Sequence, residues 1–277
     1  MRDLLIIVQL ILLVWLRSVL AAYFPSVNFT VYRGDRALVT LFTDNINYET
    51  EATEIVLENQ TVDAVVTGSF RNLTKLQYLR LVNDRIRLVE RGAFSALPRL
   101  RTLNLNFNLL REITEGVFEG LDMVKLSLVG NGIESIAPGA FRNLKSLETL
   151  DLSRNGLNSL RKGIFSNTRN LRQIDLSFNR LNHIDGYFFF EPFANRIDAG
   201  PDSFIDLNHN ILTRIEKDTF AGAGCVRSIR IQHNDLVAVH PEAFELEHLE
   251  RVHVEGNDLC DAKFKPGATS RPLWFSC

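Results

Sequence analysis

The chain lacks a strong excess of either charge. Its 31 Lys and Arg residues stand against 33 Asp and Glu residues in 277 positions, a formal net charge of −2. This balance excludes a general binder of nucleic acid or of anionic membranes, because such proteins need a basic surface. Motifs of catalysis are missing too: there is no nucleophile elbow, no phosphate-binding glycine loop and no pattern of paired carboxylates. We therefore expect neither an enzyme nor a bound cofactor.

Long apolar runs are also missing after the N-terminus. Arg2 is followed by an apolar run over residues 4–16, and small residues at 21–22 offer a cleavage point. A run of 13 residues is shorter than the ~20 residues of a membrane span. We predict that residues 1–22 are a signal peptide and that the mature chain is secreted and extracellular. The alternative is a retained signal anchor, which would keep the protein on a membrane.

The remaining sequence is a repeat of about 24 residues, as in residues 147–165, LETLDLSRNGLNSLRKGIF. Leucines and an asparagine follow the spacing LxxLxLxxN, and a phenylalanine stands ten residues after the asparagine. The asparagine position recurs at intervals of 24, 24, 23, 24, 24, 31, 24 and 23 residues, as Gln60, Asp84, Asn108, Asn131, Asn155, Asn179, Asn210, Asn234 and Asn257. The phenylalanine position is filled by Phe70, Phe94, Phe118, Phe141, Phe165, Phe189, Phe220 and Phe244.

Burial explains the repeat. One unit cannot cover its own apolar face, so neighbouring units must stack and share an interior. The two closest leucines alternate as a short strand, and successive strands pair in parallel ~4.8 Å apart. The asparagine amide satisfies backbone groups where the chain bends out of the strand. We predict a mostly β solenoid of the α/β type, with nine repeats over residues 52–259, a parallel sheet on the concave face and a phenylalanine spine on the convex side.

These repeats resemble the extracellular class of leucine-rich repeat proteins, such as Toll-type receptor ectodomains, Slit and small secreted insect immune proteins. The resemblance covers residues from about 52 to 260. It implies a right-handed horseshoe that binds a protein partner through its concave face. A homodimer or heterodimer is left open by the odd number of cysteines and by the extra aromatic residues near Phe189. Three roles remain open: innate immune recognition, a cell-adhesion, guidance or matrix module, and a horseshoe-type enzyme inhibitor.

Residues 23–51 precede the repeats and are expected to form an N-terminal cap. Two strand-like runs, at 29–32 and 37–42, flank the turn-forming Arg33-Gly34-Asp35-Arg36. We predict a β-hairpin that covers the open edge of the sheet. Members of the resembling family often close this end with paired cysteines, which this chain lacks. The Arg-Gly-Asp tripeptide also matches an adhesion motif, and a hairpin turn explains it equally well.

The three cysteines lie toward the C-terminus. A disulfide between Cys260 and Cys277 would close a cap over residues 260–277 and stabilise it by ~3 kcal/mol in the chain-entropy model. Cys225 is then either a buried small hydrophobe or a thiol that links to another chain. Pairing of Cys225 with Cys277 is a further alternative. Three sequons, at Asn28, Asn59 and Asn72, predict N-glycosylation near the N-terminal end.

One interruption lies between Phe189 and Asn210, where seven extra residues include Phe190 and Phe193 beside Phe188. The added aromatics either pack into a local bulge of the core or form an exposed patch for a partner. Asp202 also stands where a leucine is expected, which predicts a distorted coil.

The candidate binding residues flank the strand leucines, where side chains should project into solvent on the concave face. Acidic and basic residues at these positions number eight each, so we expect recognition of a mixed charge pattern. Exposed aromatics beside charges are typical of binding hot spots. The candidates are Tyr78, Arg80, Phe107, Asp151, Arg154, Asp175, Phe178, Phe204, Asp206, His209, Arg230, His233 and His253.

Two groups among these candidates allow a more specific expectation. Asp151, Asp175 and Asp206 form an acidic stripe whose repulsion requires an offset, for which we name Arg154, Arg172 or a basic partner. The histidines, near Asp206, suggest zinc or a pH switch. A solenoid aligns like residues without selecting ligand geometry, however, so we predict no metal site.

Overall fold

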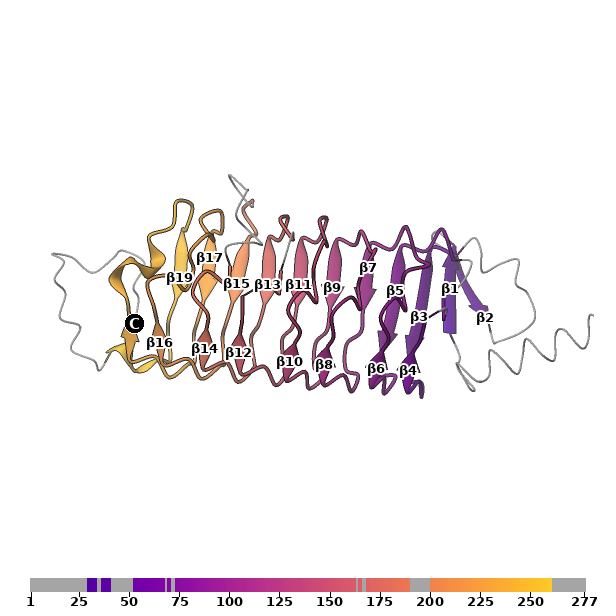
Figure 1. Cartoon of the computed structure of the whole chain (residues 1–277), viewed down its shortest axis with the longest axis horizontal. Helices are drawn as coiled ribbons and strands as arrows, with labels where there is room; N and C mark the ends of the chain where they lie inside the picture. The colour runs from indigo at the N-terminus through magenta and orange to yellow at the C-terminus, as the bar shows by residue number, and fades with distance from the viewer. Residues whose placement is uncertain are drawn as a thin grey trace, which may run out of the picture.

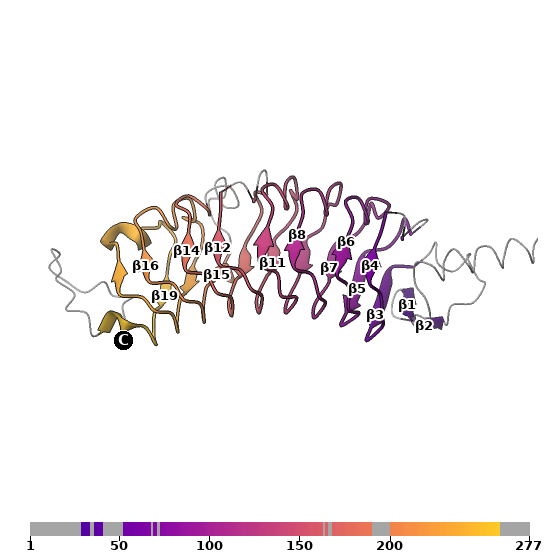
Figure 2. The same cartoon turned by 60° about the horizontal axis from the view of Figure 1, so that its bottom comes forward.

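The computed structural model describes residues 29–33, 36–40, 52–67, 69–70, 73–162, 164–165, 168–189 and 200–260. It is a gently curved row of stacked coils, with a long sheet along one side and short strands along the other (Figures 1 and 2). The predicted parallel sheet is confirmed, and its nine parallel strands are β3 (Glu54–Glu58), β5 (Tyr78–Val82), β7 (Thr102–Asn104), β9 (Lys125–Ser127), β11 (Thr149–Asp151), β13 (Gln173–Asp175), β15 (Phe204–Asp206), β17 (Ser228–Arg230) and β19 (Arg251–His253).

The opposite side carries two-residue strands that pair in parallel between coils. They are β4 (Ala64–Val65), β6 (Leu88–Val89), β8 (Glu112–Ile113), β10 (Ser135–Ile136), β12 (Ser159–Leu160), β14 (His183–Ile184), β16 (Arg214–Ile215) and β18 (Ala238–Val239). Two short 3-10 helices, η1 (Pro241–Phe244) and η2 (Asp258–Cys260), lie in the last coils. In the described part of the chain, no helix is both long and apolar enough for a membrane crossing.

The predicted N-terminal hairpin is present. Strands β1 (Phe29–Arg33) and β2 (Arg36–Thr40) pair antiparallel, and β1 also pairs antiparallel with β3. The hairpin thus occupies the edge that the first repeat would otherwise leave open. The Gly34 and Asp35 of the adhesion-like tripeptide lie outside the described residues.

An asparagine ladder joins the coils at the bend after each strand. Asn155 is representative: its Nδ2 donates to the carbonyl of Leu152 at 2.9 Å and to that of Leu128, one coil earlier, at 3.0 Å. Its Oδ1 accepts the backbone N–H of Ile133 at 3.0 Å. The same side-chain donation recurs at Asn108, Asn131, Asn179, Asn210, Asn234 and Asn257. The asparagines therefore satisfy buried backbone groups that no strand partner reaches.

The phenylalanine spine is likewise confirmed. Five pairs of neighbouring spine rings stack with centroid distances between 5.4 and 5.9 Å. The rings of Phe94, Phe141, Phe189 and Phe220 are fully buried. One continuous apolar core therefore runs through all the repeats, with the strand leucines on one side and the phenylalanines on the other.

At the interruption, Phe188 joins the core. Its ring packs edge-on against Phe165 at 5.3 Å and against Phe189 at 4.9 Å, and only 4% of the residue is exposed. Phe190 and Phe193 lie outside the described residues. The sheet register continues across the insertion, because Ile174 of β13 stands opposite Ile205 of β15.

Asp202 itself points outward, and the neighbouring Ser203 takes the inner place. The Ser203 hydroxyl donates to the carbonyl of Gly200 at 2.8 Å and accepts the backbone N–H of Arg227 at 3.1 Å. The local distortion predicted here is thus a polar rung that replaces a leucine.

Of the cysteines, Cys225 is 2% exposed, which fits the buried small hydrophobe. Cys277 lies outside the described residues, so the Cys260–Cys277 disulfide remains a prediction.

Candidate functional site

Four of the predicted residues form a stacked column, which we call the inner-face column: Arg154, Phe178, His209 and His233. The guanidinium carbon of Arg154 lies 4.4 Å from the centre of the Phe178 ring. Phe178 stacks on His209 at 4.2 Å, and His209 stacks on His233 at 4.5 Å. All four side chains are exposed. The column is therefore a planar, partly cationic surface that spans four consecutive coils.

The backbone explains why these side chains stack. Each column residue directly precedes a ladder asparagine and has a positive φ, from 53° at His233 to 57° at Arg154. Their N–H groups donate to carbonyls of the next coil, as from Phe178 to Asn208 at 2.9 Å. The repeated left-handed conformation points every side chain at this position the same way. Stacked coils then place planar groups at stacking distance.

A second cluster lies on strands β15 and β17. The Arg230 guanidinium lies 4.6 Å from the centre of the Phe204 ring and 3.2 Å from Oδ2 of Asp206. The arginine therefore satisfies the buried carboxylate and covers the ring at once. His253 stands opposite Arg230 in the sheet register, on β19, and so lies on the strand ladder and outside the inner-face column.

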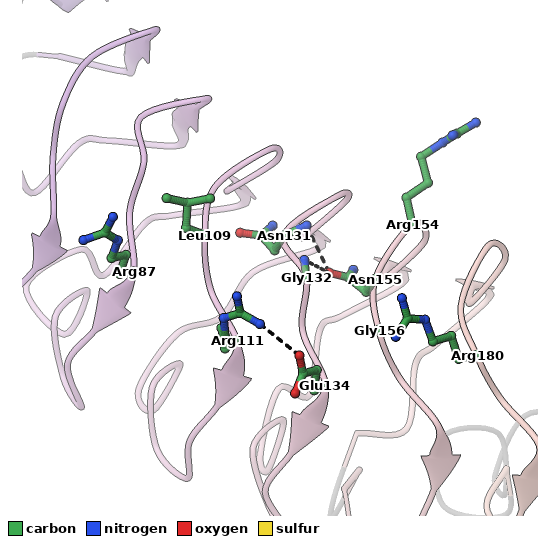
Figure 3. A pocket seen from close by; sticks show the side chains of 10 residues that line it. All are labelled: Arg87, Leu109, Arg111, Asn131, Gly132, Glu134, Arg154, Asn155, Gly156 and Arg180. Atoms are coloured by element: carbon green, nitrogen blue, oxygen red, sulfur yellow. Dashed lines mark hydrogen bonds and ion pairs between the residues drawn. The ribbon is translucent and has the colours of Figure 1, made fainter.

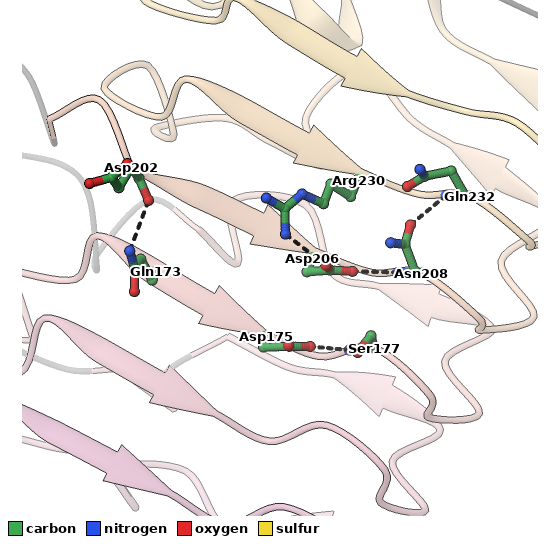
Figure 4. A network of polar contacts seen from close by, with 8 residues as sticks. All are labelled: Gln173, Asp175, Ser177, Asp202, Asp206, Asn208, Arg230 and Gln232. Carbon is green, nitrogen blue, oxygen red and sulfur yellow. Dashed lines mark hydrogen bonds and ion pairs between the residues drawn. The ribbon is translucent and has the colours of Figure 1, made fainter.

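The acidic stripe is a real ladder of carboxylates across three strands. Asp151, Asp175 and Asp206 stand opposite one another in the register. Burial raises the pKa of Asp175 above its ordinary value, hydrogen bonds from Ser177 lower it, and the charges of Asp151 and Asp206 raise it further. Figure 4 shows how the backbone N–H groups of Ser177 and Asn208 meet the carboxylates of Asp175 and Asp206.

The exposure expected for Asp206 and the role expected for Arg154 and Arg172 are wrong, and the basic partner stays a prediction. Asp206 does not project into solvent: it is only 7% exposed, because it accepts from the Asn208 N–H at 3.0 Å and lies under Arg230. The offset to the carboxylate repulsion is also different. Arg154 lies over Phe178, and Arg172 pairs with Glu148 at 3.4 Å. Arg230 and the backbone N–H groups two residues after each aspartate provide the offset instead.

The N-terminal candidates are separate from this region. Tyr78 on β5 is 45% exposed, and Arg80 on the same strand pairs with Glu58 at 2.8 Å. Phe107 is 52% exposed and has the same positive φ as the column residues. Its ring lies over Gly130, which interrupts the column between Phe107 and Arg154. The predicted set therefore divides into the inner-face column, the neighbouring strand residues from Asp151 to His253, and three residues nearer the N-terminus.

No three His, Cys, Asp or Glu side chains are grouped as a metal site requires within the residues that the structure describes. His209 and His233 lie face to face, so their ring nitrogens do not converge on a common point.

Among the predicted glycosylation sites, Asn59 is exposed and its Oδ1 accepts from Nδ2 of Asn83 at 2.7 Å. Asn28 and Asn72 lie outside the described residues.

Sequence reasoning missed the polar residues that support the stripe. Ser153 donates its hydroxyl to Asp151 Oδ1 at 2.7 Å, and the Ser177 N–H donates to Asp175 Oδ1 at 2.9 Å. A signal for them exists: in three consecutive repeats a serine or asparagine follows the aspartate by two residues. That spacing lets the i+2 backbone and side chain meet the carboxylate.

Comparisons with known proteins agree with this architecture. The leucine rich repeat family pattern matches residues 50–110, 74–125 and 122–181. A chain in the octameric complex of Latrophilin 3, Unc5D and FLRT2 aligns with a TM-score of 0.62 and 25% identity, over 73% of this chain and 60% of that one. No curated protein sequence matches the chain significantly.

Two receptor complexes are also similar. A chain of the TLR13–ssRNA13 complex aligns with a TM-score of 0.56 and 28% identity, over 67% of this chain and 29% of that one. A chain of the Toll–Spatzle complex from Drosophila aligns with a TM-score of 0.54 and 23% identity, over 68% and 28%, which supports the fold alone. The chain thus spans between 28% and 60% of the length of these three.

Proposed function

Because this chain belongs to the leucine-rich repeat family, we propose that it binds a protein partner through the C-terminal half of its inner face. The contact surface consists of the inner-face column and the neighbouring Phe204, Asp206 and Arg230. A fold alone does not define a ligand, so the proposal depends on this site and not on the repeats in general.

The single observation that carries the proposal is the inner-face column. Four planar side chains are stacked in a row, and Phe178 is 42% exposed although it is a large apolar ring. A rigid, preordered aromatic surface loses little side-chain entropy on binding. Aromatic and arginine side chains are also the residue types that dominate protein-binding hot spots. The carboxylates beside them favour a partner segment that carries both charge signs.

Site-specific photo-crosslinking tests this proposal. A photoreactive phenylalanine analogue at position 178 should crosslink to one partner in the native extracellular fluid, which mass spectrometry would then identify. The same analogue at position 187 is the matched control, because Tyr187 is 48% exposed and lies close to the phenylalanine spine, two residues before Phe189. Equal crosslinking at both positions would argue against the inner face.

The identified partner then allows a quantitative test. Replacing Phe178 and His209 by alanine should weaken its binding by about a hundredfold, since two central hot-spot rings are lost. Tyr187→Ala should leave binding unchanged. A column variant that binds as tightly as the native chain would exclude this surface as the contact.

Secretion and an immune context are part of the same proposal. The apolar run at 4–16 and the sequons support passage through the secretory pathway, and the immune context depends on the resemblance of the repeats to small secreted insect immune proteins. Expression of the full chain in a secreting cell, followed by N-terminal sequencing of the medium fraction, tests secretion. We expect a mature chain that starts near residue 23; retention of residues 1–22 on a membrane would favour the anchor.

A further inference from the structure

A groove lies beside the inner-face column, with which it shares Arg154. It has a volume of about 630 Å³ and is lined by residues of the second to sixth repeats (Figure 3). Most of these residues stand at or just after a ladder position, where the chain passes from the long sheet to the short strands. Arg111 directly precedes β8, and Glu134 directly precedes β10. We call this feature the arginine groove.

Two glycines open the groove. Gly132 and Gly156 each follow a ladder asparagine, the place that Leu109 and Arg180 hold in the flanking coils. A side chain at Gly132 would meet no atom within 4 Å, so the space above it is open. Leu109 is 43% exposed at one end of this gap. The absence of two adjacent side chains therefore leaves a hollow between coils that are otherwise evenly covered.

The charges in the groove are unbalanced. Its lining holds four arginines and a single carboxylate, on a chain whose net charge is −2. Arg111 and Glu134 pair at 3.0 Å. Among the described residues, Arg87 and Arg180 have no carboxylate partner. Figure 3 shows Arg154 directed away from Gly156 and Arg180, and its guanidinium lies over the Phe178 ring. The two ends of the groove thus present guanidinium groups that are available to a ligand.

We propose that the arginine groove binds an extended acidic segment of a protein partner, as a second contact surface beyond the inner face. Arginine donates to carboxylates in a planar fork, which gives both affinity and orientation. Coils ~4.8 Å apart place Arg87 and Arg180, four coils apart, roughly 19 Å from each other. An extended chain of about six residues covers that length.

The lining favours a peptide over a uniform polyanion. Glu134 lies between the arginines, so a sulfated glycan or an RNA strand would place one of its regularly spaced anionic groups against a carboxylate. A peptide with an acidic residue near each end and an apolar or neutral centre avoids that repulsion. Its centre would lie over Leu109 and the two glycines.

Fluorescence anisotropy with the full mature chain tests the assignment. The probe is a labelled twelve-residue peptide of Gly and Ser that carries two glutamates six residues apart, measured at low ionic strength, where surface charge interactions are least screened. Replacing Arg87 and Arg180 by glutamine should weaken its binding by about tenfold, since two charge-assisted contacts are lost. Glu134→Gln should strengthen binding, because it removes the one repelling carboxylate.

The matched control removes the same charge elsewhere. Arg99 and Arg214 are exposed and also have no ion-pair partner among the described residues. The double variant R99Q/R214Q should bind the peptide as the native chain does, and unfolding curves would confirm that both double variants remain folded. An equal loss in both double variants would reduce the effect to net charge and overturn the proposal.

Two further probes distinguish the ligand class. A sulfated hexasaccharide and a twelve-nucleotide RNA should bind more weakly than the peptide at equal concentration. If either binds more tightly and is released by R87Q/R180Q, the groove recognises a polyanion and the peptide assignment is wrong. Because Phe178 and His209 lie outside the groove, their alanine variants should leave peptide binding unchanged, so failure of this proposal is distinguishable from failure of the inner-face proposal.

Discussion

The N-terminal and C-terminal coils share one scaffold but differ in the two residues at each bend. From Asn108 onward the bend holds a ladder asparagine, whereas Asp84 and Gln60 replace it in the first two coils. Just before the bend, planar side chains form the inner-face column from Arg154 to His233, whereas Gly130 interrupts that row. The buried residue at each bend thus controls stability. The exposed residue just before it controls the surface available for binding.

The difference shows that a repeat tolerates change at the surface far more readily than inside. Gly130 removes a column residue, yet its N–H still donates to the Ser153 carbonyl at 3.0 Å and the ladder continues. Asp84 keeps one ladder bond, because its Oδ1 accepts the Gln60 N–H at 2.8 Å. Its other oxygen occupies the place of the asparagine Nδ2, where it is buried and has no hydrogen-bond partner.

The largest effect is expected from breaking an intact rung. Asn179 donates to the carbonyls of Leu152 and Leu176, both at 3.0 Å, and accepts the N–H of Leu157 at 3.1 Å. Asn179→Ala should lower the free energy of unfolding by about 3 kcal/mol, because these buried groups lose their partner. Urea unfolding would measure the change. Asn158→Ala is the control: Asn158 is exposed in the preceding coil, and an equal loss there would disprove a special role of the ladder.

The next effect comes from repairing the defective rung. Burial raises the pKa of Asp84 from 3.8 to about 6, and Glu58 adds to the rise against the hydrogen bond from Gln60. The native state therefore holds the Asp84 proton more tightly than the unfolded chain does. The protonated carboxyl can donate as Nδ2 does, so its stabilising contribution is full below pH ~4 and is lost as the pH rises through about 6.

Asp84→Asn should consequently raise the free energy of unfolding at pH 8 by about 2 kcal/mol and change it little at pH 4. Urea unfolding of both proteins at pH 4, 6 and 8 gives the comparison. Asp63→Asn is the control, because Asp63 is exposed one residue before β4. If the free energies of unfolding of the native chain and of the Asp84→Asn variant differ by the same amount at all three pH values, the buried-carboxylate account is contradicted.

The sequence predicts most of the inner framework and only part of the surface. Leu150 and Asn155 reveal their roles because stacking forces the same residue at the same place in each coil. The burial of Asp206 depends on Arg230, one coil later, and no periodicity predicts which side chain will cover another. The column residues Phe178 and His209 were identifiable by position. Their stacking was not, because it requires the left-handed backbone that the structure reveals.

The arginine groove was not predicted at all. It arises where two adjacent coils happen to carry glycine after the asparagine, at Gly132 and Gly156, so it is a property of neighbouring coils and not of one repeat. The sequence does hold a signal for the groove, because glycine follows the ladder asparagine in these two coils.

The smallest effect is expected where the column is interrupted. Gly130 has a φ of 67°, and a Cβ there would lie 2.7 Å from the Phe107 ring. Gly130→Ala should cost about 1.5 kcal/mol, the sum of the left-handed strain and the displacement of that ring from the coil. Gly132→Ala is the matched case: its φ is 88° and no atom lies within 4 Å, so only the strain of about 1 kcal/mol applies. Thermal and urea unfolding of the two variants should therefore differ slightly, and the difference should disappear in the background of Phe107→Ala. If the difference between the two variants persists without the Phe107 ring, contact with that ring is not its cause. The exposed position before the bend would then influence stability in a way that the C-terminal column does not suggest.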